Sequence, residues 1–214
     1  TVSEYVRHDI AQTLGLGLDK ISVAYNGCRE TFVPIQEIEK QEVRRQFSNG
    51  QAYFFYTGAI HPRKNIPRLL RAFDIFKKRT ASPVKLLLAG RLAWQTDEVT
   101  AALEQATYRS DIHLLGYVPE EILPKLMAAA LALTYVSLSE GFGLPMLEAM
   151  HTDTPVLAAN ATCLPEIAGN AALLVDPLSE VSMAAGLEKL WTDPDFAQQL
   201  VVRGRVRRER FSWD

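Results

Sequence analysis

The sequence has few of the features that mark metal-bound, disulfide-bonded or membrane proteins. Its two cysteines, Cys28 and Cys163, lack C-x-x-C spacing, so we expect reduced thiols in a cytoplasmic protein rather than ligands or a bridge. No apolar run approaches the roughly 20 residues that span a bilayer, and no secretory signal is visible. The formal net charge of -2 provides no broad positive field, so nucleic acid is not an expected partner.

Several motifs of nucleotide-binding and catalytic sites are also missing. There is no Walker-type GK[ST] and no G-x-S-x-G, and Met146 occupies the third glycine position of G-x-G-x-x-G after Gly141 and Gly143. The four histidines have no metal-ligand spacing, so we expect no metal site. The incomplete glycine fingerprint disfavours a dehydrogenase.

What the sequence does contain is a regular alternation of short β-rich apolar runs and amphipathic helical patterns. With 48% hydrophobic and 22% charged residues, the chain can bury a sizeable core. The alternation predicts an α/β fold with a Rossmann-like, doubly wound parallel sheet. The expected strands are 52–58, 84–90, 111–116, 131–136, 154–159 and 171–175, and the expected helices include a helix with apolar positions from 66 to 76, 97–108, one beginning at Pro119, 179–192 and 194–209.

The first residues do not follow this alternation. SEYVRHDIAQTL reads as one helix and KISVAYNG as a strand ending in an Asn-Gly turn. We interpret 1–35 as the tail and linker of a preceding domain and 36–214 as the main domain, and the opening without methionine suggests a piece of a longer protein. The charged run EIEKQEVRR, 37–45, indicates a solvated helix face.

In a doubly wound sheet, ligands bind outside the carboxyl ends of the strands, so the turns there are candidate sites. In TGAIHPRKN, Gly58 permits a sharp turn, Arg63 and Lys64 add positive charge, and Asn65 can cap the next helix. A helix N-terminus with two cations could hold a diphosphate. The alternative is that both cations are ordinary surface charges.

The second turn, SEGFGLPMLEAM, combines glycines with two carboxylates. Gly141 and Gly143 allow close backbone approach, and Pro145 opens a helix whose positive end faces the crevice. Because carboxylates repel a diphosphate, the expected targets of Glu140 and Glu148 are hydroxyl groups of a sugar and a ribose. Taken singly, each glutamate also fits a capping or dipole-stabilising role.

The third turn, GYVPEE, carries a weaker signal. Its glycine and Val118 suit the edge of a base-binding slot, and they suit a plain βα connection equally well.

These turns lie in segments that resemble, in order, the retaining glycosyltransferases of the GT-B fold called group 1 or family 4. The segments are YTGAIHPRKNIPRLLRAF, LLLAGRLAW, GYVPEEILPKLMAAA, SEGFGLPMLEAM, TPVLAANATCLPEIAGNAALLVDP and RFSW, which cover nearly all of 50–214. The most specific element is the pair Glu140 and Glu148, with seven residues between them. The resemblance implies the C-terminal, donor-binding half of such an enzyme, with TVSEYVRHDI and ISVAYNG similar to the end of the N-terminal, acceptor-binding half.

The resemblance also implies a role for each residue. Lys64 and Arg63 would hold the donor diphosphate, Glu148 the ribose hydroxyls, and Glu140 the hydroxyls of the transferred sugar. Gly58 and Val118 would line the donor site, and the backbone of Gly141, Phe142, Gly143 and Leu144 would lie near phosphate and sugar. Many relatives carry arginine at the position of Ala59 and glycine at that of Asn65; we expect Arg63 to replace the missing charge.

The implied reaction is transfer of a hexose from a nucleotide diphosphate sugar to an acceptor hydroxyl, with retention and without a cofactor or metal. The PRKN variant is similar to bacterial mannosyltransferases of polysaccharide assembly, which favours GDP-mannose as donor. The acceptor would be a saccharide or lipid-linked molecule bound by the missing half, in the cytoplasm or peripherally at the inner face of the membrane. A nucleotide-sugar epimerase of GT-B architecture and a noncatalytic nucleotide-binding module stay open as alternatives.

Overall fold

The computed structural model describes residues 1–91, 93 and 97–213, and within them the chain forms one parallel sheet. Its order is β3-β2-β1-β4-β5-β6, and every neighbouring pair is parallel. The strands are β1 Tyr53–Thr57, β2 Lys85–Ala89, β3 Ile112–Gly116, β4 Ala132–Tyr135, β5 Val156–Ala159 and β6 Leu173–Val175. All six coincide with predicted runs, so the predicted Rossmann-like α/β sheet is confirmed.

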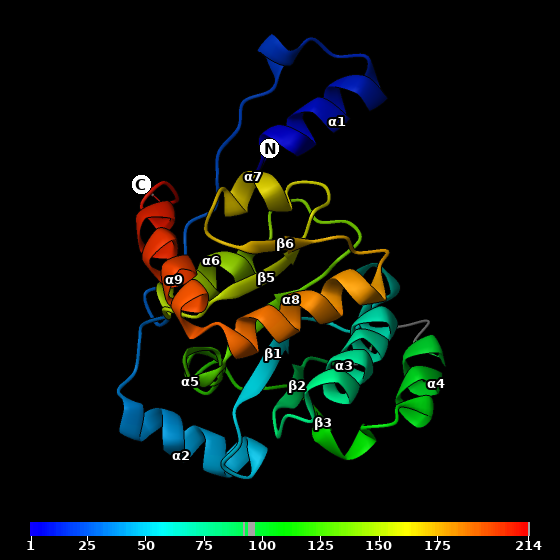
Figure 1. Cartoon of the computed structure of the whole chain (residues 1–214). Coiled ribbons are helices and arrows are strands. Elements are labelled where there is room, and N and C mark those ends of the chain that lie inside the picture. Colours follow the sequence, from blue (N-terminus) through cyan, green and yellow to red (C-terminus); the bar gives the residue numbers. More distant parts are fainter. Residues whose placement is uncertain (92, 94–96, 214) are drawn as a thin grey trace.

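The strands are buried on both faces, which explains why they read as continuous apolar runs. In β1, Tyr53 and Phe55 point into one core, whereas Phe54 and Tyr56 point into the other. The core that contains Phe54 and Tyr56 is covered by α3 Ile66–Thr80, α4 Asp97–Gln105 and α8 Glu180–Thr192; the core that contains Tyr53 and Phe55 is covered by α2 Glu37–Ser48, α5 Leu123–Ala129, α6 Leu144–His151 and α7 Leu164–Ala168 (Figure 1). Helix α9, Pro194–Arg208, packs against α8 and α6 and so closes one end of the sheet.

Strand order reverses between β1 and β4, which places a crevice outside the carboxyl ends of these two strands. The turns that follow β1, β2 and β3 are joined there by backbone hydrogen bonds: Gly58 N donates to Ala89 O at 2.9 Å, and Gly90 N donates to Gly116 O at 2.7 Å. Gly90 has a φ of 154°, and a Cβ at this position would lie 1.9 Å from Gly58 O. Only glycine allows the first two turns to meet this closely.

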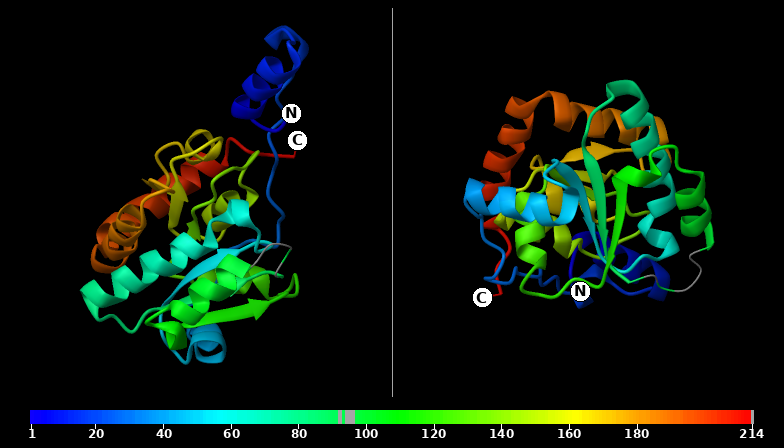
Figure 2. Two further views of the ribbon diagram at one scale, coloured as in Figure 1. Left: turned by 90° about the vertical axis from the view of Figure 1, so that its right-hand side faces the viewer. Right: turned by 90° about the horizontal axis from the view of Figure 1, so that it is seen from below.

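The N-terminal helix α1, Glu4–Leu14, projects from the body beyond α7 (Figures 1 and 2). Its first turn is held by a backbone carbonyl and a side chain from two other parts of the chain. Ser3 Oγ donates to Gly141 O at 2.7 Å, and the backbone N–H groups of Glu4 and Tyr5 donate to the Glu166 carboxylate at 2.8 and 3.0 Å. The start of the chain is therefore attached to the glycine-rich turn after β4.

The predicted strand 20–27 is wrong. A short 3-10 turn, Leu18–Lys20, is followed by a segment outside regular secondary structure, in which Ala24 N donates to Thr1 O at 2.8 Å. A strand needs a neighbouring strand to complete its hydrogen bonds, and in the described part of the chain this segment pairs with none. Assignment of 1–35 to a separate domain stays a prediction.

Two predicted helix ends also shift. The helix expected from Pro119 begins at Leu123, because the Pro119 carbonyl first accepts from both Ile122 N and Leu123 N in a turn. The helix expected over 97–108 ends at Gln105, because the Asp74 carboxylate binds the next N–H groups, those of Thr107 and Tyr108. The charged run 37–45 lies in α2, whose Val43 is buried and whose other face is solvated, as predicted.

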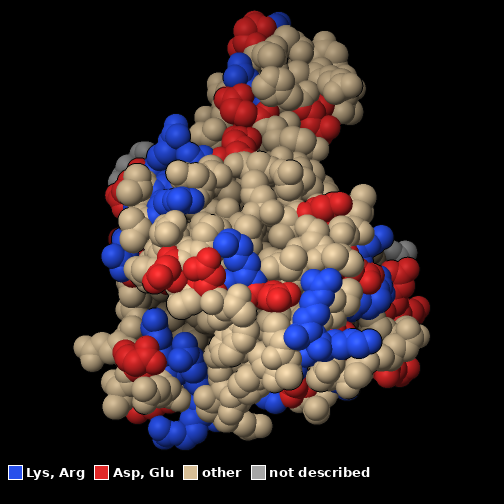
Figure 3. Space-filling model, in the orientation of Figure 1, with Lys and Arg blue, Asp and Glu red and all other residues tan. Residues whose placement is uncertain are grey.

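The surface seen in Figure 3 shows basic and acidic side chains interspersed, with no large region of one sign on that face. None of the described helices is long and apolar enough to cross a bilayer.

Candidate active site

The sheet brings two neighbouring cations together with a carboxylate that is far from them in sequence. Arg63 and Lys64 lie in the short 3-10 turn Pro62–Lys64 after β1, and Glu140 lies in the turn after β4, the strand next to β1. Lys64 Nζ lies 2.5 Å from Glu140 Oε1, and Arg63 Nη1 lies 2.9 Å from Glu140 Oε2. Lys64 Nζ also donates to the Tyr135 hydroxyl at 3.0 Å. We call Arg63, Lys64 and Glu140 the ion-pair cluster.

Two members of the ion-pair cluster, Lys64 and Glu140, are largely removed from water, whereas the Arg63 side chain is 48% exposed. Lys64 is 7% exposed, and burial lowers its pKa, although Glu140 acts in the opposite direction. Burial alone would raise the pKa of Glu140, but the hydrogen bonds and charges from Lys64 and Arg63 outweigh it and hold the pKa below its ordinary value. With Lys64 and Arg63 as cations and Glu140 as a carboxylate, the cluster has a net positive charge, which suits an anion.

The glycine-rich turn leads from the ion-pair cluster directly into α6. Gly143 takes the N-cap position with a φ of 92°, and a Cβ there would lie 2.8 Å from Leu164 Cδ2. Pro145 lies in the first turn of the helix, as predicted, and Leu144 begins it. The Phe142 ring is buried against Phe211 and Tyr25. Only the backbone of Phe142 is thus placed to serve a ligand, and its ring anchors the turn.

Glu148 lies on the same helix but contacts a different cation. Its side chain is buried, and its Oε1 accepts from Arg29 Nη2 at 3.4 Å. Burial raises the pKa of Glu148, whereas the charge and hydrogen bond of Arg29 act to lower it. The two glutamates of the motif are thus held by separate cations, Glu140 by the ion-pair cluster and Glu148 by the segment between α1 and α2.

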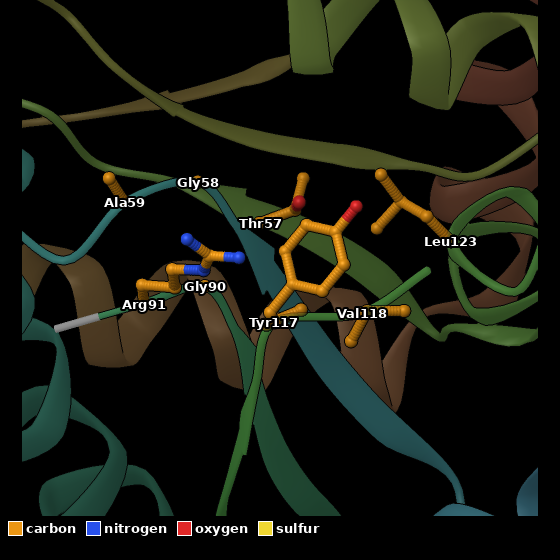
Figure 4. Close-up of a pocket in the computed structure, with 9 residues that line it drawn as sticks. Thr57, Gly58, Ala59, Gly90, Arg91, Tyr117, Val118 and Leu123 are labelled. Carbon is orange, nitrogen blue, oxygen red and sulfur yellow. The ribbon is translucent and has the colours of Figure 1, made fainter. Parts of the chain in front are cut away.

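A cavity of about 420 Å³ opens at the carboxyl ends of β1, β2 and β3 (Figure 4). The Tyr117 ring lies between the Arg91 guanidinium and Leu123 in this view, and Arg91 Cζ is 4.8 Å from the centre of the ring. An aromatic face beside an apolar wall is the kind of surface on which a nucleobase stacks. The lining residues are Thr57, Gly58, Ala59, Ala89, Gly90, Arg91, Tyr117, Val118 and Leu123.

The cavity contains two of the predicted site residues, Gly58 and Val118, and Gly58 lies beside Lys64. Gly58 has a φ of 132°, and a Cβ there would lie 3.3 Å from the Tyr56 hydroxyl and 4.0 Å from Lys64 Cε. Lys64 and Glu140 do not line the cavity but lie beyond Gly58. The cavity therefore lies next to Lys64, the buried cation of the ion-pair cluster.

The prediction that Asn65 caps α3 is wrong. Asn65 occupies the N-cap position with a φ of 62°, but its side-chain amide donates to Val136 O at 3.1 Å and to Pro177 O at 2.7 Å. The residue therefore joins the turn after β1 to the ends of β4 and β6. Whether Arg63 replaces an arginine at Ala59 stays a prediction: Ala59 lines the cavity, and Arg63 binds Glu140.

Sequence reasoning missed Arg29, Tyr117 and Arg91. Tyr117 and Arg91 follow the glycines of GY and AGR, so their positions just after a strand were the signal that could have revealed them. Arg29 follows an Asn-Gly pair and carried no such signal. Within the described ranges, no group of three or more His, Cys, Asp or Glu side chains is arranged to hold a metal ion.

Comparison with known proteins agrees with this geometry. The family model described as glycosyl transferases group 1 matches residues 37–207, and the chain belongs to this family. The resemblance inferred from the motifs is thereby confirmed.

Two curated relatives are mannosyltransferases. O-antigen chain mannosyltransferase B from Escherichia coli is 35% identical over 100% of this chain and 56% of its own length. O-antigen chain mannosyltransferase RfbU from Salmonella typhimurium is 30% identical over 91% of this chain and 51% of its own length. The chain thus spans about half the length of the curated relatives it matches.

Among solved structures, HepE from Anabaena in complex with UDP-glucose superposes with a TM-score of 0.88. It is 20% identical, and the match covers 98% of this chain and 58% of that chain. At this identity the likeness shows the fold, and it confirms the GT-B type of Rossmann-like domain.

Proposed function

We propose that this chain is the donor-binding half of a retaining hexosyltransferase that moves mannose from GDP-mannose to an acceptor hydroxyl in polysaccharide or glycolipid assembly. The observation that carries the proposal is the ion-pair cluster, because two cations and one carboxylate converge beside a base-sized cavity at the carboxyl edge of the sheet. Family membership and the two mannosyltransferase relatives support the reaction class and the sugar.

In the proposed complex, three parts of the donor contact different residues. The base enters the cavity and stacks on Tyr117; the diphosphate reaches Lys64, Arg63 and the N-terminus of α6; the ribose hydroxyls bind Glu148. Glu140 accepts hydrogen bonds from the sugar being transferred. In this structure the two cations bind Glu140, so donor binding would exchange part of an internal ion pair for phosphate oxygens.

The proposed chemistry needs little covalent participation by the protein. As the bond between the anomeric carbon and the phosphate oxygen breaks, negative charge grows on the leaving diphosphate, where Lys64, Arg63 and the helix dipole stabilise it. The acceptor oxygen attacks the same face of the oxocarbenium-like sugar and gives its proton to the departing phosphate. Glu140 is thus assigned sugar positioning and not general-base catalysis.

The test combines binding and turnover. We expect calorimetric titration of GDP, UDP and ADP into this chain to show tightest binding for GDP. In the longer protein, Glu140→Gln should lower mannose transfer from GDP-mannose while leaving GDP affinity within about threefold. Failure of all three nucleotides to bind a well-folded sample would contradict the assignment of a donor site. Tightest binding of UDP would contradict the assignment of GDP-mannose as the donor.

The epimerase alternative makes a different prediction for the same protein. An epimerase releases an altered sugar nucleotide without any acceptor, whereas a transferase needs the acceptor for product to appear. Nuclear magnetic resonance of GDP-mannose incubated with the longer protein alone distinguishes them by the presence or absence of a second sugar nucleotide.

A further inference from the structure

In the segment between α1 and α2, Arg29 contacts a carboxylate of the proposed donor site. Arg29 begins a turn that is closed by a hydrogen bond from Phe32 N to Arg29 O at 3.2 Å. Its guanidinium lies 5.1 Å from the centre of the buried Phe32 ring, and its two terminal nitrogens point to two carboxylates. One is Glu120 at 3.2 Å, and the other is Glu148 at 3.4 Å.

The two carboxylates differ in their need for this arginine. The Glu120 side chain is 78% exposed, so water solvates it well and the pair contributes little. The Glu148 side chain is 6% exposed, and a buried carboxylate that loses its cation is left largely without solvation. The contact that matters is therefore the one between Arg29 and Glu148.

We propose that Arg29 is a positioning residue of the donor site, which holds the Glu148 carboxylate in place for the two ribose hydroxyls. The proposal rests on the function proposed above, in which Glu148 receives the ribose. The new element of the proposal is that the segment before the donor domain completes the ribose site. The preference for a ligand with both ribose hydroxyls would then depend on Arg29.

The geometry leaves room for both partners. Two carboxylate oxygens offer about four acceptor positions, and Arg29 approaches Oε1 with one nitrogen. The carboxylate can therefore accept a hydroxyl while the arginine stays bound. The closed turn and the Phe32 ring restrict the movement of the guanidinium, so less side-chain freedom has to be lost when the ribose binds.

The test compares GDP with 2′,3′-dideoxy-GDP, which lacks both hydroxyls, in calorimetric titrations of this chain. Arg29→Ala should weaken GDP about tenfold, equivalent to about 1.4 kcal/mol, and weaken the dideoxy analogue less than about twofold. Arg29→Lys, which keeps the charge, should recover most of the GDP affinity. Glu120→Gln is the matched control: it removes the other partner of the same arginine and should leave both ligands unchanged.

The double variant Arg29→Ala with Glu148→Gln decides whether the arginine acts through the glutamate. We expect it to bind GDP no more weakly than Glu148→Gln alone. Additive losses, or equal losses for GDP and the dideoxy analogue, would overturn the positioning role. If Glu148→Gln itself does not discriminate between the ligands, the ribose assignment fails; if it does and Arg29→Ala has no effect, only the present inference fails.

Discussion

At the scale of single residues, Lys64 offers a direct test of the phosphate site. Lys64→Ala removes a buried cation that the proposal places against the diphosphate, and we expect nucleoside diphosphate binding to weaken by roughly 1.5–3 kcal/mol. Guanosine, which has no phosphates, should be nearly unaffected in the same calorimetric titration. Equal losses for nucleoside and nucleotide would exclude Lys64 as a phosphate ligand.

A matched lysine controls for the loss of charge alone. Lys189 is half-exposed on α8 and pairs with Asp193 near the surface, so Lys189→Ala changes the net charge equally without touching the site. We expect its nucleotide affinity to equal that of the unchanged chain. Thermal melts of both variants show whether the Lys64 variant, in which Arg63 remains to balance Glu140, is still folded.

Prediction from the sequence succeeded for residues whose neighbours carry the signal. Glu140 stands beside Gly141, and Lys64 follows Gly58 in the turn after β1; a parallel sheet necessarily gathers strand ends at one edge. The contact between Arg29 and Glu148 spans 119 residues and joins a turn to a helix, so no local pattern encodes it. The roles of these residues toward a donor stay predictions, whereas their positions are now defined.

At the scale of elements, the close contact of the first two turns makes Gly90 sensitive. Gly90→Ala forces a Cβ against Gly58 O in a backbone region that side chains rarely adopt, so we expect a loss of about 3 kcal/mol in unfolding free energy. Gly50→Ala is the control, because Gly50 also has a positive φ, 79°, but nothing within 4 Å of the added Cβ. It should cost only about 1 kcal/mol. Urea denaturation measures both, and similar losses would show that the contact with Gly58 is unimportant.

A second element-scale prediction concerns the attachment of α3 to the edge of the sheet. Asp111, just before β3, lies 2.6 Å from Lys77 Nζ and also pairs with Lys85. Lys77 is 3% exposed, so Asp111→Asn leaves a buried cation without its carboxylate and should cost about 3 kcal/mol in urea denaturation. Asp9→Asn, on the exposed face of α1, should change stability by less than about 0.5 kcal/mol. If Asp111→Asn lowers the unfolding free energy no more than the control does, the ion pair between Lys77 and Asp111 does not attach α3 to the sheet edge.

The same carboxylate predicts a pH dependence. Burial alone would raise the pKa of Asp111, but Lys77 and Lys85 outweigh it and lower the pKa below the ordinary 3.8. A carboxyl group whose pKa is lower in the folded state stabilises the fold fully above the unfolded value, and this stabilisation disappears as the pH falls through the folded value. We expect denaturation midpoints to fall more steeply below about pH 4 in the unchanged chain than in Asp111→Asn.

Helices and strands were predictable where the pattern of apolar residues in their own sequence showed which side chains are buried. The strands β1 to β6 are buried by helices encoded next to them, so their apolar runs sufficed. The segment 20–27 has the composition of a strand, but its state depends on a pairing partner that its own sequence cannot supply. The early end of α4 depends on Asp74, a residue of α3 some thirty positions away.

At the scale of the whole molecule, the domain reading predicts binding without catalysis. The sheet has a hydrophobic core on each face, so this chain should fold alone and bind GDP with a dissociation constant between roughly 10 μM and 1 mM. Transfer should be undetectable, because positioning an acceptor contributes up to about 7–11 kcal/mol and the proposed function assigns this role to an acceptor-binding half other than this domain. Incubation of this chain with GDP-mannose and saccharide or lipid acceptors measures the transfer activity. Robust transfer would refute the interpretation that catalysis needs a second, acceptor-binding half.

The hydrogen bonds that join the turns after β1, β2 and β3 affect the thermodynamics of ligand capture. Gly58 N donates to Ala89 O and Gly90 N donates to Gly116 O, so the backbone at these two glycines is already ordered by hydrogen bonds and loses little conformational entropy when a nucleotide binds. Amide hydrogen exchange at both glycines should therefore be slow before as well as after binding. A flexible phosphate loop loses conformational entropy when it closes on its ligand. At Gly58 and Gly90 this entropy is lost during folding, so the nucleotide affinity should depend little on loop motion.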